Sequence, residues 1–171
     1  VSGPSGIGKD TVVGNLIKNH EGIERSSSAT TRPPRVGETQ GRLYYYMDVP
    51  GFEKLIDEDA FVEYTNYAGN FYGTLKSEVD KRIQNGITCV LVIEVNGTAN
   101  VRRVYPNCTT VFIVAPTMEE HERRLRARGS ESEEVMAERM RIAGEEMKIA
   151  DSYDFVLLND DAERCTEELY Q

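Results

Sequence analysis

The amino-acid sequence predicts an α/β fold with a largely parallel β-sheet. Apolar runs typical of strands alternate along the chain with segments of helical periodicity, and a glycine-rich loop at residues 3–8 precedes a helical pattern. Such alternation is typical of βα units, in which helices cover a parallel sheet. With 171 residues and 39% hydrophobic content, the chain suits a single compact domain that buries its own core.

The clearest strands are uninterrupted apolar runs at residues 89–93, 110–114 and 155–158. Strands without polar alternation are expected where helices cover both faces of a sheet. Val1 and Ser2 are too few to form the strand that should lead into the glycine-rich loop. We therefore expect the native protein to have a few residues before Val1.

Helix starts are indicated by helical periodicity and by capping residues. Thr117 with Glu120, and Ser130 with Glu133, have the spacing of a capping box. The expected starts are Lys9, near Phe52, near Ser77, near Gly97, Thr117, Ser130 and Asp161.

Residues 25–73 differ in amino-acid composition from the rest of the chain. They are rich in Ser, Thr, Tyr and Arg, with short β-like pieces at 42–47 and 61–67. We interpret this segment as a small insertion that carries a binding site and contributes little to the core.

Composition and charge argue against several classes of protein. The net charge of −9 argues against a surface for nucleic acid or anionic membrane. No stretch approaches the roughly 20 apolar residues that span a bilayer, and no amino-terminal signal is visible. The three cysteines lack CxxC spacing, which argues against a disulfide framework or zinc site. We expect a soluble, cytoplasmic protein in which the isolated His20 and His121 have no catalytic role.

The glycine-rich loop has the sequence of a phosphate-binding loop. Residues 3–9 read GPSGIGK, which satisfies the pattern GxxxxGK. Glycines at these positions let backbone N–H groups point at phosphate oxygens, and the helix start adds its positive dipole end. Lys9 would bridge the β- and γ-phosphates. The motif predicts a nucleoside triphosphate site, and the alternative is a glycine-rich turn that caps a helix.

Further segments accompany this loop, at residues 29–35 (ATTRPPR), 69–74 (GNFYGT), 124–131 (RLRARGSE) and 159–161 (NDD). In this order and spacing, over nearly the whole chain from Ser2, the sequence resembles the guanylate kinase family. The resemblance implies a P-loop kinase core with a mostly parallel sheet flanked by helices, a small mixed β/α GMP-binding subdomain, and a helical lid. The implied bounds are 1–28, 75–123 and 150–171 for the core, about 29–74 for the GMP-binding subdomain and about 124–149 for the lid.

The resemblance also implies a phosphotransferase that moves the γ-phosphate of ATP onto GMP, with Mg²⁺ bound alongside the ATP. Its partners would be these small-molecule substrates, and the oligomeric state is not indicated. The residues implied to bind ATP are Gly3, Pro4, Ser5, Gly6, Gly8, Lys9, Asp10, Thr11 and Asn159. Those implied to take part in catalysis by positioning the substrates and neutralising charge are Lys9, Arg32, Arg124, Arg128 and Arg139. No general base is needed, because the attacking oxygen of GMP is already ionised.

On the acceptor side, Arg32 and Arg35 flank a rigid Pro-Pro pair, and fork-shaped guanidiniums suit a doubly charged phosphate. Glu63 would accept hydrogen bonds from N1–H and the amino group of guanine, whereas adenine would leave it unpaired. The residues implied to bind GMP are Ser28, Arg32, Arg35, Tyr44, Glu63, Tyr72, Thr74 and Glu94. The alternative for the arginine pair alone is a basic surface turn.

Two positions depart from the family pattern. Asp10 stands where a hydroxyl residue or glycine is usual, and Val92 stands where an acid is usual. We hypothesise that Asp10 replaces the missing carboxylate in holding Mg²⁺ or its waters; the competing account is impaired chemistry. Two other functions remain open, a catalytically weak or inactive interaction domain that binds peptides, and a kinase for another phosphate monoester.

Overall fold

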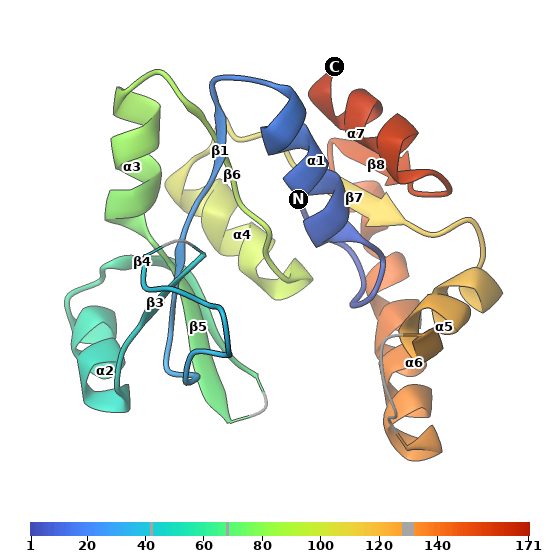
Figure 1. The fold of residues 1–171 in the computed structure, drawn as a ribbon, viewed down its shortest axis with the longest axis horizontal. Coiled ribbons are helices and arrows are strands. Elements are labelled where there is room, and N and C mark those ends of the chain that lie inside the picture. The colour runs from blue at the N-terminus through green and yellow to red at the C-terminus, as the bar shows by residue number, and fades with distance from the viewer. Residues whose placement is uncertain (42, 68, 128–131) are drawn as a thin grey trace. The chain divides into compact units, whose positions relative to one another are not determined.

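The structure, a computed structural model, describes residues 1–41, 43–67, 69–127 and 132–171 (Figure 1). Helices and strands alternate along the chain, which confirms the α/β class. The order is α1 (Lys9–Asn19), β1 (Ile23–Arg25), β2 (Ser28–Thr30), β3 (Tyr44–Tyr46), α2 (Val49–Asp57), β4 (Phe61–Tyr67), β5 (Asn70–Leu75), α3 (Lys76–Gln84), β6 (Thr88–Val90), α4 (Val95–Val104), β7 (Val111–Val114), α5 (Met118–Ala127), α6 (Glu133–Met147), the short 3₁₀ helix η1 (Ala150–Ser152), β8 (Phe155–Leu158) and α7 (Ala162–Tyr170).

The chain divides into two compact units. The first unit comprises Val1–Glu21, Val92–Val95 and Cys108–Gln171. The second unit comprises Gly22–Leu91 and Asn96–Asn107. The glycine-rich loop and the predicted lid arginines belong to the first unit, and the residues implied to bind GMP belong to the second, except Glu94.

Parallel strands organise the first unit. β7 pairs with β8 in parallel, from Val111 opposite Phe155 to Val114 opposite Leu158. Ser2 forms a parallel bridge with Phe112 on β7, and Ile93 N–H donates to the Val1 carbonyl at 3.2 Å. Ser2 therefore occupies a parallel strand position beside β7, and the glycine-rich loop begins directly after it. In α/β proteins, ligands bind at the carboxyl ends of such strands.

Helix α1 is anchored to this unit by its apolar side. Val12 on α1 is fully buried in a cluster with Ile7, Ile113 and Cys165. Cys165 lies on α7, so α1 packs against α7 as well as β7. This packing holds the start of α1, and with it the end of the glycine-rich loop, in a rigid environment.

The second unit contains a four-stranded mixed sheet in the order β3-β2-β5-β4. The sheet packs on α2 around Phe52, which is fully buried and stacks on Phe61 at 4.5 Å and Phe71 at 5.2 Å. Residues 25–73 therefore have a hydrophobic core of their own, which corrects the expectation that this segment contributes little to the core. Phe52 and Phe61 supply most of that core together with Ala29, and Phe71 packs against them.

Most predicted boundaries are close to the observed ones. The strand predicted at 89–93 ends at Val90, because the chain leaves the second unit for the first at Leu91–Val92. Thr117 caps α5, its Oγ1 accepting from Glu120 N–H at 3.1 Å, and Asp161 caps α7. The predicted start at Ser130 lies outside the described residues, and α6 begins after Ser132, whose side chain accepts from Val135 N–H. In the described ranges, no helix combines the length and apolar character needed to cross a membrane.

Candidate functional site

The glycine-rich loop adopts backbone conformations that require its glycines. Gly3, Gly6 and Gly8 have φ angles of 143°, 84° and 100°, a region that side-chain-bearing residues rarely enter. Gly8 is also the N-cap of α1. The loop therefore ends at a helix start, where the positive end of the helix dipole favours a bound anion.

The Lys9 ammonium lies over this loop. Its Nζ donates to the carbonyl oxygens of Gly3, at 2.5 Å, and Pro4, at 3.0 Å. An ammonium held against the loop backbone is positioned to contact phosphate oxygens that bind the same loop. Asp10 follows as an exposed residue in the first turn of α1.

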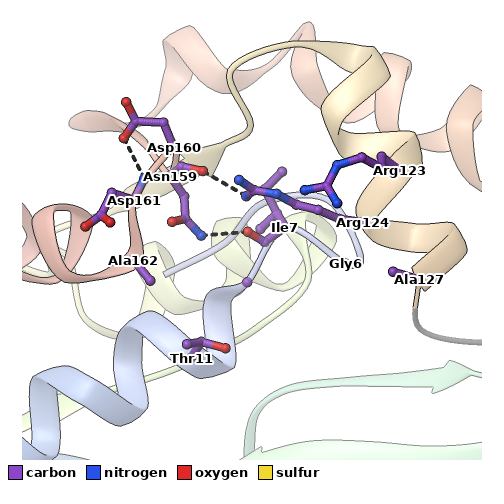
Figure 2. A pocket seen from close by; sticks show the side chains of 11 residues that line it. Gly6, Ile7, Thr11, Arg123, Arg124, Ala127, Asn159, Asp160, Asp161 and Ala162 are labelled. Atoms are coloured by element: carbon purple, nitrogen blue, oxygen red, sulfur yellow. Dashed lines mark hydrogen bonds between the residues drawn. The ribbon is translucent and has the colours of Figure 1, made fainter.

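A pocket of about 440 Å³ opens beside the loop and lies wholly within the first unit (Figure 2). Several residues implied to bind ATP line it, and the predicted lid residue Arg124 joins them. The lining residues are Gly6, Ile7, Gly8, Thr11, Arg123, Arg124, Ala127, Asn159, Asp160, Asp161 and Ala162. Gly3, Pro4, Ser5, Lys9 and Asp10 belong to the same loop and helix start but do not line this pocket.

Asn159 connects the loop, β8 and α5. Its side-chain Nδ2 donates to the Ile7 backbone carbonyl at 2.8 Å, and the Asn159 backbone carbonyl accepts from Arg124 Nη1 at 2.8 Å (Figure 2). The side chain is almost fully buried. Asn159 thus binds the phosphate loop on one side and a predicted catalytic arginine on the other.

The predicted lid arginines converge on the same loop. Arg139 on α6 donates from Nη1 to Ser5 Oγ at 3.3 Å, and Arg124 on α5 reaches the end of β8 as described. Arg128 lies outside the described residues. The first unit therefore collects Lys9, Arg124 and Arg139 around one glycine-rich loop, a concentration of positive charge suited to a polyphosphate.

Glu120 balances part of this charge. Its side chain binds Arg123 at 2.7 Å and Arg124 at 2.7 Å, and these two guanidiniums lower the pKa of the Glu120 carboxyl to about 2. Arg123 is exposed and also lines the pocket. Arg126 is an exposed surface residue, bound to Glu122 and Glu133.

His121 was not expected to take part in the site. Its ring is 2% exposed, and Nε2 lies 2.7 Å from the Ser5 carbonyl oxygen. Burial lowers the pKa of His121. The only signal in the sequence is its place on α5, four residues before the buried Leu125 and therefore on the inward face of that helix.

In the second unit, four residues implied to bind GMP form one row across the sheet. The register places Tyr44 opposite Ser28, Ser28 opposite Thr74 and Thr74 opposite Glu63. Directly paired residues on neighbouring strands project to the same face of a sheet. The fold thus gathers residues from β3, β2, β5 and β4 that are far apart in the sequence.

Glu63 is the buried carboxylate of this row. It is 8% exposed, and its Oε1 accepts from Thr74 Oγ1 at 2.6 Å. A Cβ on Gly97 would lie only 3.0 Å from Glu63 Oε2, so the lack of a side chain at Gly97 keeps space at this oxygen. Sequence reasoning missed Gly97, because nothing local marks its contact with β4.

Arg32 is held by an anion and two aromatic rings. Its Nη2 binds Glu38 at 3.0 Å, and its guanidinium lies 5.4 Å from the Tyr44 ring centre and 5.7 Å from that of Tyr46. Glu38 also accepts from Tyr46 Oη at 2.9 Å and from Arg35 N–H at 2.7 Å. The Arg35 N–H, the main cause, together with Tyr46 and Arg32 lowers the pKa of Glu38. Glu38 and Tyr46 were both missed, although Tyr44 and Tyr46 have the spacing that places residues on one face of a strand.

The other residues implied to bind GMP are Tyr72, Arg35 and Glu94, and they lie outside the row that contains Glu63. The Tyr72 ring lies 6.2 Å from that of Tyr44, edge to face. Arg35 is exposed. Glu94 is exposed and belongs to the first unit. The second unit therefore brings together a carboxylate, hydroxyls and a stacked guanidinium, a donor and acceptor set that fits a nucleoside monophosphate.

Comparison with known proteins gives one consistent result. The sequence pattern of the family described as "Guanylate kinase" matches residues 1–171. A protein named guanylate kinase from Nostoc sp. is 42% identical over 167 residues, covering 98% of this chain and 84% of that protein. Another so named from Carboxydothermus hydrogenoformans is 42% identical over 169 residues, covering 99% and 83%.

A solved structure agrees with these sequence matches. The crystal structure of guanylate kinase from Anaplasma phagocytophilum superposes with a TM-score of 0.76 at 29% identity, covering 99% of this chain and 79% of that one. The family pattern, the sequence relatives and the solved structure each match nearly the whole chain. This chain therefore belongs to the guanylate kinase family.

Proposed function

We propose that this chain transfers the γ-phosphoryl group of ATP to the phosphate of GMP, with ADP and GDP as products. Family membership supports this reaction. The observation that carries the acceptor's identity is the cross-strand row that ends in Glu63. The buried Glu63 carboxylate lies beside the Thr74 hydroxyl and beside Gly97, which has no side chain to fill the space. Such a carboxylate accepts hydrogen bonds, and guanine offers donors at N1–H and its amino group.

On the acceptor side, Glu63 and Thr74 select guanine, with Ser28 and Glu94 as further contacts. Adenine has an acceptor at N1, which would face the Glu63 carboxylate with no hydrogen to donate, at about 1–3 kcal/mol for each unsatisfied buried group. Arg32 and Arg35 bind the phosphate together with the hydroxyls of Tyr44 and Tyr72. Glu38 keeps the Arg32 guanidinium against the tyrosine rings, which fixes its direction before GMP arrives.

On the donor side, the backbone of the loop and Lys9 bind the triphosphate, and Asn159 contributes to the nucleotide pocket. The arginines of the proposed lid, about residues 124–149, neutralise the charge that develops on the transferring group. Arg124 and Arg139 are already oriented towards the loop by Asn159 and Ser5. Positioning and charge neutralisation suffice for this reaction, since GMP brings an ionised oxygen as nucleophile.

The residues at the loop fit a Mg²⁺ ion that is held mainly by ATP. Within the described ranges, no group of three or more His, Cys, Asp or Glu residues could hold a metal. Mg²⁺ at nucleotide sites is commonly bound by phosphates, waters and one or two carboxylates, and Asp10 is an exposed carboxylate one residue after Lys9. We propose Asp10 as that carboxylate; the ion would supply further neutralisation of phosphate charge.

The proposed bounds of the functional parts are those implied by the family, with the core at 1–28, 75–123 and 150–171 and the GMP-binding subdomain at about 29–74. We also propose a reducing compartment, the cytoplasm, as the place of action. The free thiols of Cys89, Cys108 and Cys165 support this assignment.

A coupled assay of ADP release with ATP and Mg²⁺ tests the proposal. We expect turnover that depends on GMP, is much weaker with AMP, and is lost in the Lys9→Met variant. A titration should show that Lys9→Met still binds GMP, which separates loss of chemistry from loss of fold. GMP binding without turnover by the native chain would contradict the proposal and favour a non-catalytic interaction domain. Turnover with a ribose phosphate but not GMP would favour a kinase for another phosphate monoester.

A further inference from the structure

Two buried side chains outside the loop motif bind carbonyl groups of the phosphate loop. His121 on α5 contacts the Ser5 carbonyl oxygen through Nε2 at 2.7 Å, and Asn159, just after β8, donates from Nδ2 to the Ile7 carbonyl at 2.8 Å. The two residues are 2% and 4% exposed. Both contacts are within the first unit, and they hold alternate peptide groups of the same loop.

The chemistry of these contacts determines where the protons are. A carbonyl oxygen only accepts hydrogen bonds, so the group that faces it must donate. The Asn159 amide therefore presents its nitrogen to Ile7. In the same way, His121 must carry a proton on Nε2. Burial lowers the pKa of His121, which favours the neutral ring, and in a neutral ring that is protonated on Nε2 the unprotonated nitrogen is Nδ1.

Holding a carbonyl also orients the next N–H group. The described part of the chain has no cis peptide bonds, and in a trans peptide the C=O and the following N–H point in opposite directions. Binding the Ser5 carbonyl to His121 therefore directs Gly6 N–H away from α5. Binding the Ile7 carbonyl to Asn159 directs Gly8 N–H away from Asn159.

These two N–H groups are available for a ligand. Neither Gly6 N–H nor Gly8 N–H donates to an acceptor among the described residues. Both residues have positive φ angles, 84° and 100°. A Cβ on Gly8 would lie 2.5 Å from Asn159 Nδ2, and one on Gly6 would collide with Leu125. The loop is thus held closely against its supports while its donors stay open.

We propose that His121 and Asn159 are positioning residues that hold the phosphate loop in its polyphosphate-binding conformation, His121 through the Ser5 carbonyl and Asn159 through the Ile7 carbonyl. Without these bonds the two peptide groups can rotate, and Gly6 N–H and Gly8 N–H are no longer preorganised for phosphate oxygens. The inference rests on the proposed function in one respect: the polyphosphate is that of ATP.

Binding of inorganic tripolyphosphate, measured by calorimetry, tests the proposal without involving GMP or adenine. His121→Leu removes the donor at similar size, and Asn159→Leu does the same for the second contact. Each should weaken tripolyphosphate binding about three- to tenfold, the equivalent of one net hydrogen bond. His121→Gln can place an amide donor near the former Nε2 position and should restore most of the affinity. Because tripolyphosphate has no base, a loss in Asn159→Leu cannot come from a contact with adenine.

His20→Leu is the matched control. This histidine stacks on the exposed Tyr170 at 3.6 Å between ring centres, so its loss perturbs an aromatic contact away from the loop. Binding of tripolyphosphate should stay unchanged, and the KM for GMP should stay unchanged in every variant of this series. Folded His121→Leu with native affinity overturns the proposal. So does His121→Gln that binds as weakly as His121→Leu, since volume alone would then explain the loss.

A measurement on the native chain covers the case in which His121→Leu does not fold. Long-range ¹H–¹⁵N spectra at pH 7 should show His121 protonated on Nε2, and tripolyphosphate should shift the amide resonances of Gly6 and Gly8. A proton on Nδ1, or unshifted glycine amides with tripolyphosphate bound, overturns the proposal. A chain that binds tripolyphosphate but does not phosphorylate GMP contradicts only the proposed function. A chain that does not bind tripolyphosphate contradicts the inference itself.

Discussion

Replacement of Glu63 by glutamine changes one carboxylate oxygen to an amide nitrogen at a site where both side-chain oxygens have close neighbours. Oε1 accepts from Thr74 Oγ1 at 2.6 Å, so the remaining oxygen of glutamine keeps that place. The amide NH₂ then takes the place of Oε2, the oxygen beside Gly97. A hydrogen-bond acceptor in the guanine site becomes a donor, with almost no change of volume.

The expected loss follows from the burial of Glu63, which is 8% exposed. Guanine presents donors at N1 and its amino group, and the variant opposes one of them with another donor. One unsatisfied buried group costs about 1–3 kcal/mol, which corresponds to roughly 5- to 150-fold in kcat/KM for GMP. AMP, which presents an acceptor at N1, should gain or stay unchanged.

The assay compares kcat/KM for GMP and AMP in the native chain and in Glu63→Gln, with the KM for ATP as an internal control. Thr74→Val serves as the matched variant, because it removes the hydroxyl but leaves the Glu63 carboxylate in place. The ratio of GMP to AMP specificity should fall much more in Glu63→Gln than in Thr74→Val. A specificity for GMP within twofold of the native value in Glu63→Gln would refute the role of Glu63 in guanine recognition.

Three further predictions concern the phosphate loop. Gly8→Ala should bind ATP at least tenfold more weakly and melt at lower temperature, because φ is 100° and the new Cβ meets Asn159; native-like ATP affinity in a titration would contradict this. The pKa of His121 is lowered by burial, so below about pH 6.5 the unfolded chain takes up a proton more readily than the folded chain. The free energy of unfolding, measured in urea, should therefore fall from pH 7.5 to 5.5, and by less in His121→Gln; equal slopes would argue against this. Asp10→Ser should raise the Mg²⁺ concentration needed for half-maximal activity, and Val92→Asp added to it should lower that concentration again. Unchanged Mg²⁺ dependence and rate in Asp10→Ser would leave Asp10 without a metal role.

Local features of the sequence were enough to predict much of the fold. The glycines of the loop, the uninterrupted apolar strands and the caps at Thr117 and Asp161 depend on contacts within a few residues. The α/β class and the parallel pairing of β7 with β8 follow from their alternation with helices. The strand boundary at Val90 could not be found in this way, because the apolar run continues while the chain passes from one compact unit to the other.

The candidate site was accessible from the sequence only where a motif or the family pattern marked it. Arg32 and Tyr44 were identified, but Glu38 and Tyr46, which hold the Arg32 guanidinium, were not. A glutamate in a polar loop and a third tyrosine in a row have no local property that distinguishes them from surface residues. Their role depends on the pairing of β3 with β2, which is a tertiary contact.

The sequence by itself determined the phosphate loop, the order of strands and helices, and the family to which the chain belongs, because each of these rests on neighbours along the chain or on a pattern of motifs. Tertiary structure decided which groups support that loop. Asn159 meets Ile7 across 152 residues and His121 meets Ser5 across 116. No periodicity or spacing connects positions so far apart. Such pairs form because the tertiary fold brings α5 and the end of β8 against the loop, and the side chains of His121 and Asn159, buried there away from water, must find polar partners.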